Sequence, residues 1–120
     1  MEGSFCHVEL TTPDPSTAKT FFSRFMDWGM DEVDLPGGTY TMVHTGEGPT
    51  AGIGKAAHDK VPVAWMPYVE VDNLAATVAR AESLGAKVRL SPRLIADGIG
   101  SYALIEDPTG AVLGLFQAAT

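Results

Sequence analysis

The sequence predicts an α+β domain with two β-α-β-β-β repeats, which form curved mixed sheets around a cavity with the helices on the outside. Each half begins with an alternating polar and apolar run, continues with a capped helical pattern, and ends with three short apolar runs. The halves also share a spacing, because Tyr40 stands twelve residues before Gly52 and Tyr102 stands twelve before Gly114. Any α+β chain can show such similarities between its halves by chance, but the common order of the elements favours an internal duplication.

The first repeat is expected at about residues 5–54, beginning with an alternating strand at residues 5–10. Asp14 is a good N-cap and Pro15 suits the first helical position, so a helix of about four turns should follow. Its phenylalanines recur at helical spacing and are predicted to pack it, and Gly29 offers a stop. Three short strands complete the repeat, at residues 30–34, 39–44 and 50–54.

The second repeat is expected at about residues 64–117, after a linker at residues 55–63 that has no clear periodicity. A strand at residues 65–71 leads to a helix capped by Asp72 or Asn73 and ended by Gly85. The remaining strands are predicted at residues 86–90, 100–106 and 111–116, and residues 107–110 form a type I turn between the last two. Both repeats belong to a single domain, residues 1–120.

Composition narrows the class of partner. A chain of 120 residues with 45% apolar and 19% charged residues suits one folded domain. Its formal charge of −7 disfavours nucleic acid and anionic membranes, and no apolar run approaches the roughly 20 residues that span a bilayer. With no basic and apolar leader at its start, we expect a cytoplasmic protein. Cys6 is the only cysteine, and we interpret it as a small hydrophobe in preference to a nucleophile.

Alternation along the opening strand of each repeat separates two kinds of side chain, because residues of even separation share a face. The face directed away from the helices should carry His7, Glu9, Thr11, Met66, Tyr68 and Glu70. The helix-facing side should carry Val8, Leu10, Trp65, Val69 and Val71. Carboxylates and an imidazole in a dry core would cost several kcal/mol unless paired, so the polar face is predicted to line a cavity.

Chemistry on this face centres on His7 and Glu9, which we interpret as an acid/base pair in which the carboxylate raises the pKa of the imidazole. A hydrogen-bonded structural pair fits the same residues equally well. Tyr68 can donate to a ligand oxygen or be a core tyrosine, and Met66 is expected as a pocket wall. Tyr40 is a further candidate wall, although a one-residue change of register would turn it to the other face.

Several stretches taken in order resemble the vicinal-oxygen-chelate superfamily, also called the glyoxalase/bleomycin-resistance/dioxygenase fold. They are residues 7–10, 12–14, 21–22, 65–72 and 106–115, and they are most similar to its glyoxalase-like branch. The resemblance implies four inward-facing metal ligands, which fall here on His7, Met66, Gly52 and Gly114. Glycine has no ligating side chain and a thioether suits hard divalent ions poorly, so no metal cofactor is expected. Retention of a divalent metal by His7 with Glu9 stays open as the alternative, and both glycines are counted as pocket-lining positions.

No nucleotide or nucleophile motif is present: residues 97–100 lack the full Gly-x-Gly-x-x-Gly spacing and precede a strand. The resemblance favours a protein that binds a small organic molecule, as bleomycin resistance proteins do, with Glu9 and Glu70 suiting a cationic or hydrogen-bonding ligand. The alternative is a lyase, isomerase or dioxygenase-type enzyme acting on a small carbonyl compound through His7 and Glu9. A third hypothesis is a subunit that acts through its surface. We also expect a homodimer, because one copy can complete its concave face by pairing with another.

Overall fold

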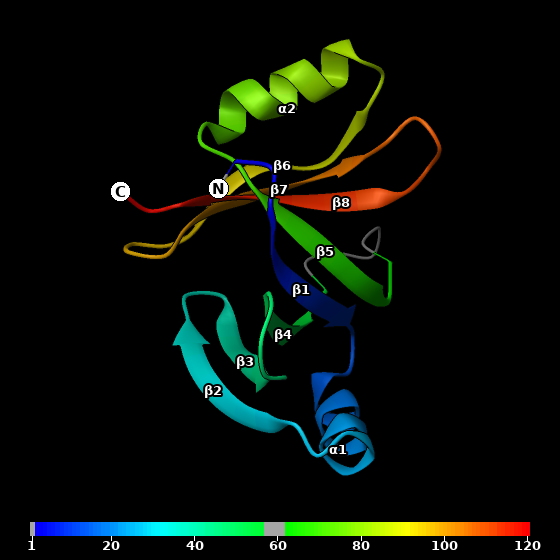
Figure 1. The fold of residues 1–120 in the computed structure, drawn as a ribbon, viewed down its shortest axis with the longest axis vertical. Helices are drawn as coiled ribbons and strands as arrows, with labels where there is room; N and C mark the ends of the chain where they lie inside the picture. Colours follow the sequence, from blue (N-terminus) through cyan, green and yellow to red (C-terminus); the bar gives the residue numbers. More distant parts are fainter. Residues whose placement is uncertain (1, 57–61) are drawn as a thin grey trace. The chain divides into compact units, whose positions relative to one another are not determined.

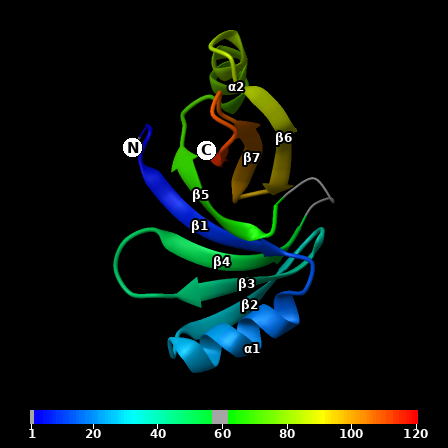
Figure 2. The same cartoon turned by 90° about the vertical axis from the view of Figure 1, so that its right-hand side faces the viewer.

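A computed structural model describes residues 2–56 and 62–120 of the chain. It contains the predicted order twice, a strand, a helix and three strands, and thus confirms the α+β class with two β-α-β-β-β repeats (Figures 1 and 2). The chain divides into two compact units, Cys6–Met66 and Met1–Phe5 with Pro67–Thr120. Part of the predicted linker, residues 57–61, lies outside the described residues. No helix in the described part of the chain is long and apolar enough to cross a membrane.

The first unit is a four-stranded mixed sheet with one helix. Its elements are β1 (Phe5–Thr12), α1 (Pro15–Phe25), β2 (Gly29–Leu35), β3 (Gly38–His44) and β4 (Thr50–Lys55). The strands lie in the order β2-β3-β4-β1, in which β1 and β4 are parallel and the other neighbours antiparallel. Alternate side chains of β1, β3 and β4 form the buried core beneath α1: Leu10, Val43, Ala51 and Ile53.

Helix α1 begins as predicted. The Asp14 carboxylate accepts hydrogen bonds from the Thr17 backbone N–H (3.1 Å) and hydroxyl (2.6 Å), and Pro15 is the first helical residue. The helix has 11 residues, or about three turns, and is thus one turn shorter than predicted. Asp27 has φ 55°, and this left-handed residue just after the cap ends the helix before Gly29 is reached.

The prediction that the phenylalanines pack α1 is only partly correct. Phe22 packs against the core and stacks with Trp28, with ring centroids 5.6 Å apart. Phe21 and Phe25 instead keep 55% and 64% of their surface exposed. Two residues four apart share one side of a helix, and here that side faces away from the sheet.

The second unit repeats the plan. Its elements are β5 (Ala64–Glu70, which belongs to this unit from Pro67 on), α2 (Leu74–Ser83), β6 (Lys87–Ala96), β7 (Gly100–Glu106) and β8 (Val112–Ala118), with strand order β5-β8-β7-β6. Asn73, one of the two candidates, is the N-cap, and its side chain accepts from the Ala76 N–H at 3.0 Å. The core consists of Val71, Leu74, Val78, Ala103, Ile105 and Leu115.

Strand β6 is longer than predicted, reaching Ala96 where the sequence indicated an end at residue 90. The added stretch contains Pro92 and lies on an outer strand of this unit's sheet, where a proline removes no required ladder bond. Three irregularities in its pairing with β7 accommodate these residues.

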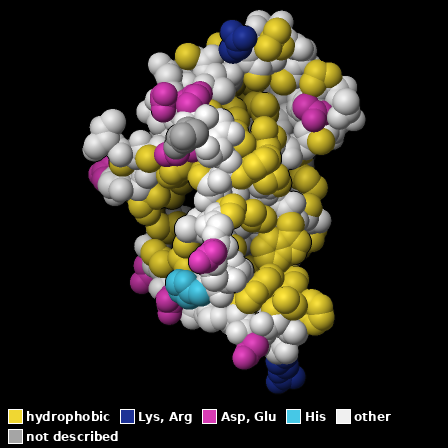
Figure 3. Space-filling view, viewed as in Figure 1, with side chains coloured by type: hydrophobic (Ala, Val, Ile, Leu, Met, Phe, Trp, Pro, Cys, Tyr) yellow, Lys and Arg dark blue, Asp and Glu magenta, His cyan; other side chains and the backbone are white. Residues whose placement is uncertain are grey.

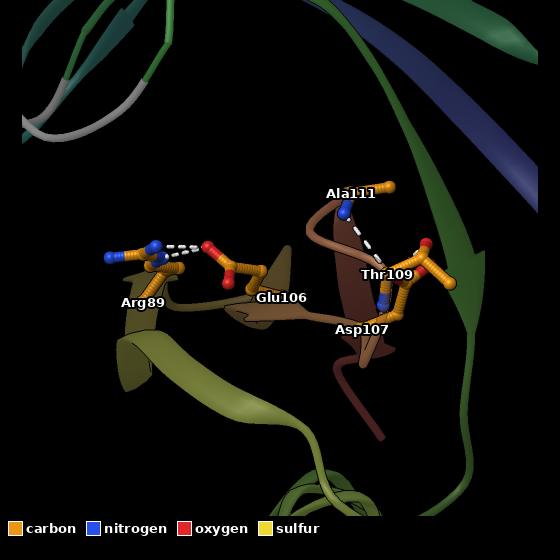
Figure 4. Close-up of polar contacts among 5 residues, drawn as sticks. All are labelled: Arg89, Glu106, Asp107, Thr109 and Ala111. Carbon is orange, nitrogen blue, oxygen red and sulfur yellow. Dashed lines mark hydrogen bonds and ion pairs between the residues drawn. The ribbon is translucent and has the colours of Figure 1, made fainter.

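The predicted turn between β7 and β8 is confirmed. The Gly110 N–H donates to the Asp107 carbonyl oxygen at 3.0 Å, and the Asp107 carboxylate accepts from the Thr109 and Ala111 N–H groups at 2.8 and 3.1 Å (Figure 4). Beside it, Arg89 on β6 forms an ion pair with Glu106 at the end of β7. This turn joins two strands that pair along their full length.

Candidate ligand-binding site

A connected set of polar side chains lies on one sheet face of the first unit. His7 Nε2 is 2.8 Å from the Tyr40 hydroxyl oxygen, and the Tyr40 hydroxyl donates to Glu9 Oε1 at 2.8 Å. On its other side, His7 Nδ1 lies 2.7 Å from Thr50 Oγ1. We call His7, Tyr40 and Glu9 the His7–Tyr40–Glu9 network. All three side chains are half-buried, so a ligand can reach them from solvent.

Strand register brings the network together. In the parallel pair β1 and β4, His7 is opposite Thr50 and Glu9 is opposite Gly52. On the other side of β4, Met42 of β3 is opposite Gly52, and Tyr40 lies two residues away from Met42, on the same face. Tyr40 is therefore one strand removed from β1 and must cross β4 to reach His7 and Glu9.

Two glycines of β4 let it cross. A Cβ at Gly52 would lie 2.5 Å from Tyr40 Cε2 and closer still to the hydroxyl oxygen, and a Cβ at Gly54 would lie 2.9 Å from Cε1. Real Cβ atoms do not approach so closely, so any larger residue would push the ring away. Gly52 thus holds the space for the Tyr40 ring, a role that the sequence did not indicate.

Burial dominates the electrostatics of these groups. It lowers the pKa of His7 and raises the pKa of Glu9, and the hydrogen bond from Tyr40 opposes the second effect. The expectation that Glu9 raises the pKa of His7 is wrong in direction. The Tyr40 hydroxyl lies between the two groups and is bonded to both, and desolvation of the imidazole sets the direction of its pKa shift.

The network can hold its protons in more than one way. When Tyr40 donates to an ionised Glu9, its oxygen accepts a proton carried by His7 Nε2. If Glu9 is instead protonated and donates a hydrogen bond to the Tyr40 oxygen, the phenol can donate its own hydrogen to an unprotonated Nε2 of His7. The heavy atoms need not move between these arrangements. The imidazole can therefore present either a proton or a lone pair, as a hydrogen-bonding site or an acid/base group requires.

The second unit also has a tyrosine over a glycine. Tyr68 on β5 is opposite Gly114 on the parallel strand β8, and a Cβ at Gly114 would lie 2.6 Å from Tyr68 Cγ. Tyr68 is 5% exposed, and its ring centroid is 6.3 Å from that of Tyr102. Its burial favours the core interpretation of this tyrosine over the ligand-donor one.

The other predicted pocket residues differ in their surroundings. Thr11 is buried, and its hydroxyl donates to the Pro62 carbonyl oxygen at 2.6 Å, so it anchors the chain before β5. Met66 is 2% exposed. The backbone of Glu70 accepts from the Gly3 N–H and donates to the Ser4 carbonyl oxygen, which ties the amino terminus to β5.

Sequence reasoning missed Thr50 and underrated Tyr40. The one sequence signal for this contact is the twelve-residue spacing from Tyr40 to Gly52, which by itself indicates duplication and not contact. Among the residues that the structure describes, no three His, Cys, Asp or Glu side chains gather in a group that could hold a metal ion.

Comparison with known proteins gives a consistent family. A family model described as a glyoxalase-like domain matches residues 7–116. The proteins named "Putative glyoxylase CFP32" from Mycobacterium bovis and Mycobacterium tuberculosis are each 35% identical over 116 residues, covering 92% of this chain and 44% of the relative. The chain therefore spans less than half the length of these relatives.

Solved structures show the same fold at low sequence identity. Hypothetical protein BH1468 from Bacillus halodurans has a TM-score of 0.70 at 12% identity, covering 100% of this chain and 97% of that chain. Methylmalonyl-CoA epimerase from Mycobacterium tuberculosis has a TM-score of 0.64 at 15% identity, with 98% and 89% covered. A glyoxalase/bleomycin resistance protein/dioxygenase superfamily member from Vibrio splendidus has a TM-score of 0.62 at 13% identity, with 92% and 95% covered.

Proposed function

Since the chain belongs to the glyoxalase-like domain family, we propose that it binds a small organic molecule, without a divalent metal, on the sheet face that carries the His7–Tyr40–Glu9 network. The observation that carries this proposal is the network itself. Three titratable side chains from two strands meet at 2.8 Å in a half-buried position, beside a strand whose glycines make room for them.

The network favours a neutral ligand with hydrogen-bonding groups. Burial raises the pKa of Glu9 and lowers that of His7, and both shifts favour the uncharged forms. An uncharged carboxyl group attracts a cation less strongly than a carboxylate does. Of the two ligand types expected from the sequence, cationic and hydrogen-bonding, the second fits better. A carbonyl or hydroxyl compound meets this requirement.

The residues at the family's metal positions do not fit a divalent ion. Met66 offers only a thioether, while Gly52 and Gly114 offer no side chain. The space above each glycine is taken by a tyrosine ring, Tyr40 in one unit and Tyr68 in the other. His7 is thus the single conventional ligand of the four, whereas catalytic zinc sites use about three.

An acid/base enzyme is the second candidate, and the phenol between imidazole and carboxyl is the observation that favours it. His7 would take or return a proton on a small carbonyl compound, and Tyr40 would pass the proton between His7 and Glu9. Such chemistry is that of an isomerase or lyase. Tyr40 forms hydrogen bonds with both residues that the sequence suggested for this chemistry, His7 and Glu9.

A thermal-shift screen against neutral carbonyl and hydroxyl compounds, with a cationic set alongside, tests the binding proposal. A compound that binds the native state should raise the Tm of the wild type, and His7→Ala and Tyr40→Phe should reduce that rise. His44→Ala is the matched control, because His44 is an exposed imidazole paired with Asp31. Binding that persists in both network variants would place the ligand elsewhere, and a screen without any shift would contradict the proposal.

Turnover separates the two candidate functions. Any compound that shifts the Tm is incubated with the protein and followed by NMR for conversion or for exchange of its hydrogens with deuterated solvent. A binding protein leaves the compound unchanged. Conversion that is lost in His7→Ala and in Glu9→Gln identifies the enzyme, whereas conversion that survives both changes removes these residues from the mechanism.

A further inference from the structure

Thr50, the first residue of β4, joins the His7–Tyr40–Glu9 network to the backbone of β1. Its Oγ1 lies 2.7 Å from His7 Nδ1, and its hydroxyl donates to the Cys6 carbonyl oxygen at 3.2 Å. Strand register produces both contacts, because Thr50 is opposite His7 in the parallel pair β1 and β4, and Cys6 directly precedes His7. Backbone pairing therefore places this hydroxyl.

The hydroxyl of Thr50 has one hydrogen for these two contacts. A carbonyl oxygen can only accept, so the contact with Cys6 needs that hydrogen. An imidazole nitrogen donates when it carries a hydrogen and accepts when it does not. Both contacts are therefore hydrogen bonds in one arrangement alone, in which the hydroxyl donates to Cys6 and accepts from His7 Nδ1–H. If the hydroxyl donated to the imidazole instead, two oxygen atoms would face each other at 3.2 Å with no hydrogen between them.

We infer that Thr50 is a positioning residue, which keeps a hydrogen on His7 Nδ1 and so presents Nε2 to Tyr40 as the proton-accepting nitrogen. In a histidine, the hydrogen bond made by one ring nitrogen determines which of the two nitrogens is protonated. For ligand binding, this role rests on the proposed function, in which the network is the ligand site.

A fixed Nδ1–H leaves the network two arrangements in which both bonds of the phenol are kept. In the first, Tyr40 donates to Nε2 and a protonated Glu9 donates to the phenol oxygen, so His7 and Glu9 are uncharged. In the second, Tyr40 donates to a Glu9 carboxylate and Nε2 carries a second hydrogen, so His7 is a cation. The Glu9 hydrogen moves to the phenol oxygen and the phenol hydrogen moves to Nε2. No proton enters or leaves the network, and Nδ1 keeps its hydrogen throughout.

The position of this hydrogen decides which atom of the site is basic. With Nδ1 protonated, the lone pair of the uncharged ring is on Nε2, on the side of Tyr40 and Glu9. A group that takes a proton from a ligand needs such a lone pair in reach of the ligand. With the hydrogen on Nε2 instead, the lone pair would be on Nδ1, which faces Thr50. The Thr50 hydroxyl thus directs the basic atom toward the rest of the network.

Among the described residues, the other histidine is His44, and its partner is of a different kind. Its Nε2 lies 2.7 Å from an Asp31 carboxylate oxygen, and both side chains are exposed. Figure 3 shows a surface of this kind, where a histidine lies beside acidic side chains and Lys and Arg side chains are few. A carboxylate only accepts, whereas His7 contacts two hydroxyl groups that can each donate or accept. His44 therefore serves as the internal reference for a measurement on His7.

Proton–nitrogen correlation NMR of the imidazole rings at about pH 8, above the ordinary pKa of histidine, tests the inference without any ligand. In the wild type, His7 Nδ1 should resonate as a protonated nitrogen and Nε2 as an unprotonated one. The loss of these signals in His7→Ala assigns them. Thr50→Val should shift Nδ1 toward the position of an unprotonated nitrogen, because the acceptor is gone. Thr50 is exposed, and valine is preferred to alanine because its second methyl group keeps water from the place of the hydroxyl.

Three further variants separate the role of the hydroxyl from a merely structural one. Thr50→Ser restores the hydroxyl and should return both His7 nitrogens to their wild-type positions. Thr39→Val, the same change at an exposed position of β3, should leave them unchanged. Tyr40→Phe removes the phenol and keeps Thr50, so Nδ1 should stay protonated, and this variant tests the inference even if Thr50→Val does not fold. Backbone amide spectra verify that each variant is folded.

An unprotonated Nδ1 in the wild type would overturn the inference. A folded Thr50→Val with unchanged His7 signals would do the same, as would a Tyr40→Phe variant in which Nδ1 loses its hydrogen. The proposed function fails separately. A thermal-shift screen without any shift contradicts ligand binding and leaves the NMR result on Thr50 intact, whereas a bound compound with an unprotonated Nδ1 removes only the role of Thr50.

Discussion

A tyrosine ring lies across a glycine in each half of the molecule, Tyr40 over Gly52 and Tyr68 over Gly114. In both cases the missing side chain leaves room for the ring. In the first unit this placement determines the chemistry of the site, because it carries the Tyr40 hydroxyl to His7 and Glu9.

Gly52→Ala should lower the free energy of unfolding by about 1–3 kcal/mol, because the new methyl group overlaps the Tyr40 ring. Urea denaturation measures the change. In a Tyr40→Ala background the same substitution should cost much less, since the overlapping ring is gone. Gly37→Ala is the control, because no atom lies within 4 Å of a Cβ at that position. An unchanged urea midpoint in Gly52→Ala would show that Tyr40 does not occupy this space.

Asp107 should make stability depend on pH. Hydrogen bonds from Thr109 and Ala111 lower the pKa of this carboxyl group in the folded state. The carboxylate therefore stabilises the fold above its unfolded pKa of about 3.9, and this contribution is lost as the pH falls through the folded pKa.

The stability difference between wild type and Asp107→Asn should thus be largest near neutral pH and shrink toward acid. Urea midpoints measured across this range test it. Thr109→Val, which removes the hydroxyl bond to Asp107 Oδ1, should reduce the dependence without abolishing it. A difference that stays constant with pH would mean that the turn does not hold the ionised carboxylate.

At the level of elements, each helix begins at a side-chain cap supplied by the residue before it, Asp14 for α1 and Asn73 for α2. The two helices differ in how they are held afterwards. Helix α2 buries Leu74 and Val78, whereas α1 has no buried residue. The cap should consequently matter more for α1, which has less packing to stabilise it.

Asp14→Ala should destabilise the protein by about 1 kcal/mol, since the Thr17 N–H and hydroxyl lose their acceptor. Thermal unfolding followed by circular dichroism gives the measurement. Asp14→Asn, which keeps an acceptor oxygen, should lose less, and Asn73→Ala provides the comparison in α2. Equal stability of Asp14→Ala and wild type would show that the cap is not formed in solution.

For the molecule as a whole, we expect no bound metal ion. Two of the family's four metal positions are glycines, Gly52 and Gly114, and a third is the thioether of Met66. Elemental analysis of the purified protein should find zinc, nickel, manganese and iron well below one ion per chain. The physical reason is that one imidazole holds a divalent ion weakly. Stoichiometric metal that disappears in His7→Ala would contradict this and would restore the alternative in which His7 and Glu9 retain a metal. The cytoplasmic location stays a prediction.

The sequence alone determined the repeated β-α-β-β-β plan, the cap of α1 and the turn at Asp107, because alternation, capping and turn formation depend on neighbours along the chain. It also placed His7 and Glu9 together on one strand face. Only the tertiary structure decided that Tyr40 stands between them, since this depends on the register of three strands and on the space above Gly52. The exposure of Phe21 and Phe25 was likewise a tertiary outcome: helical spacing shows which residues share a side, but not whether anything packs against it.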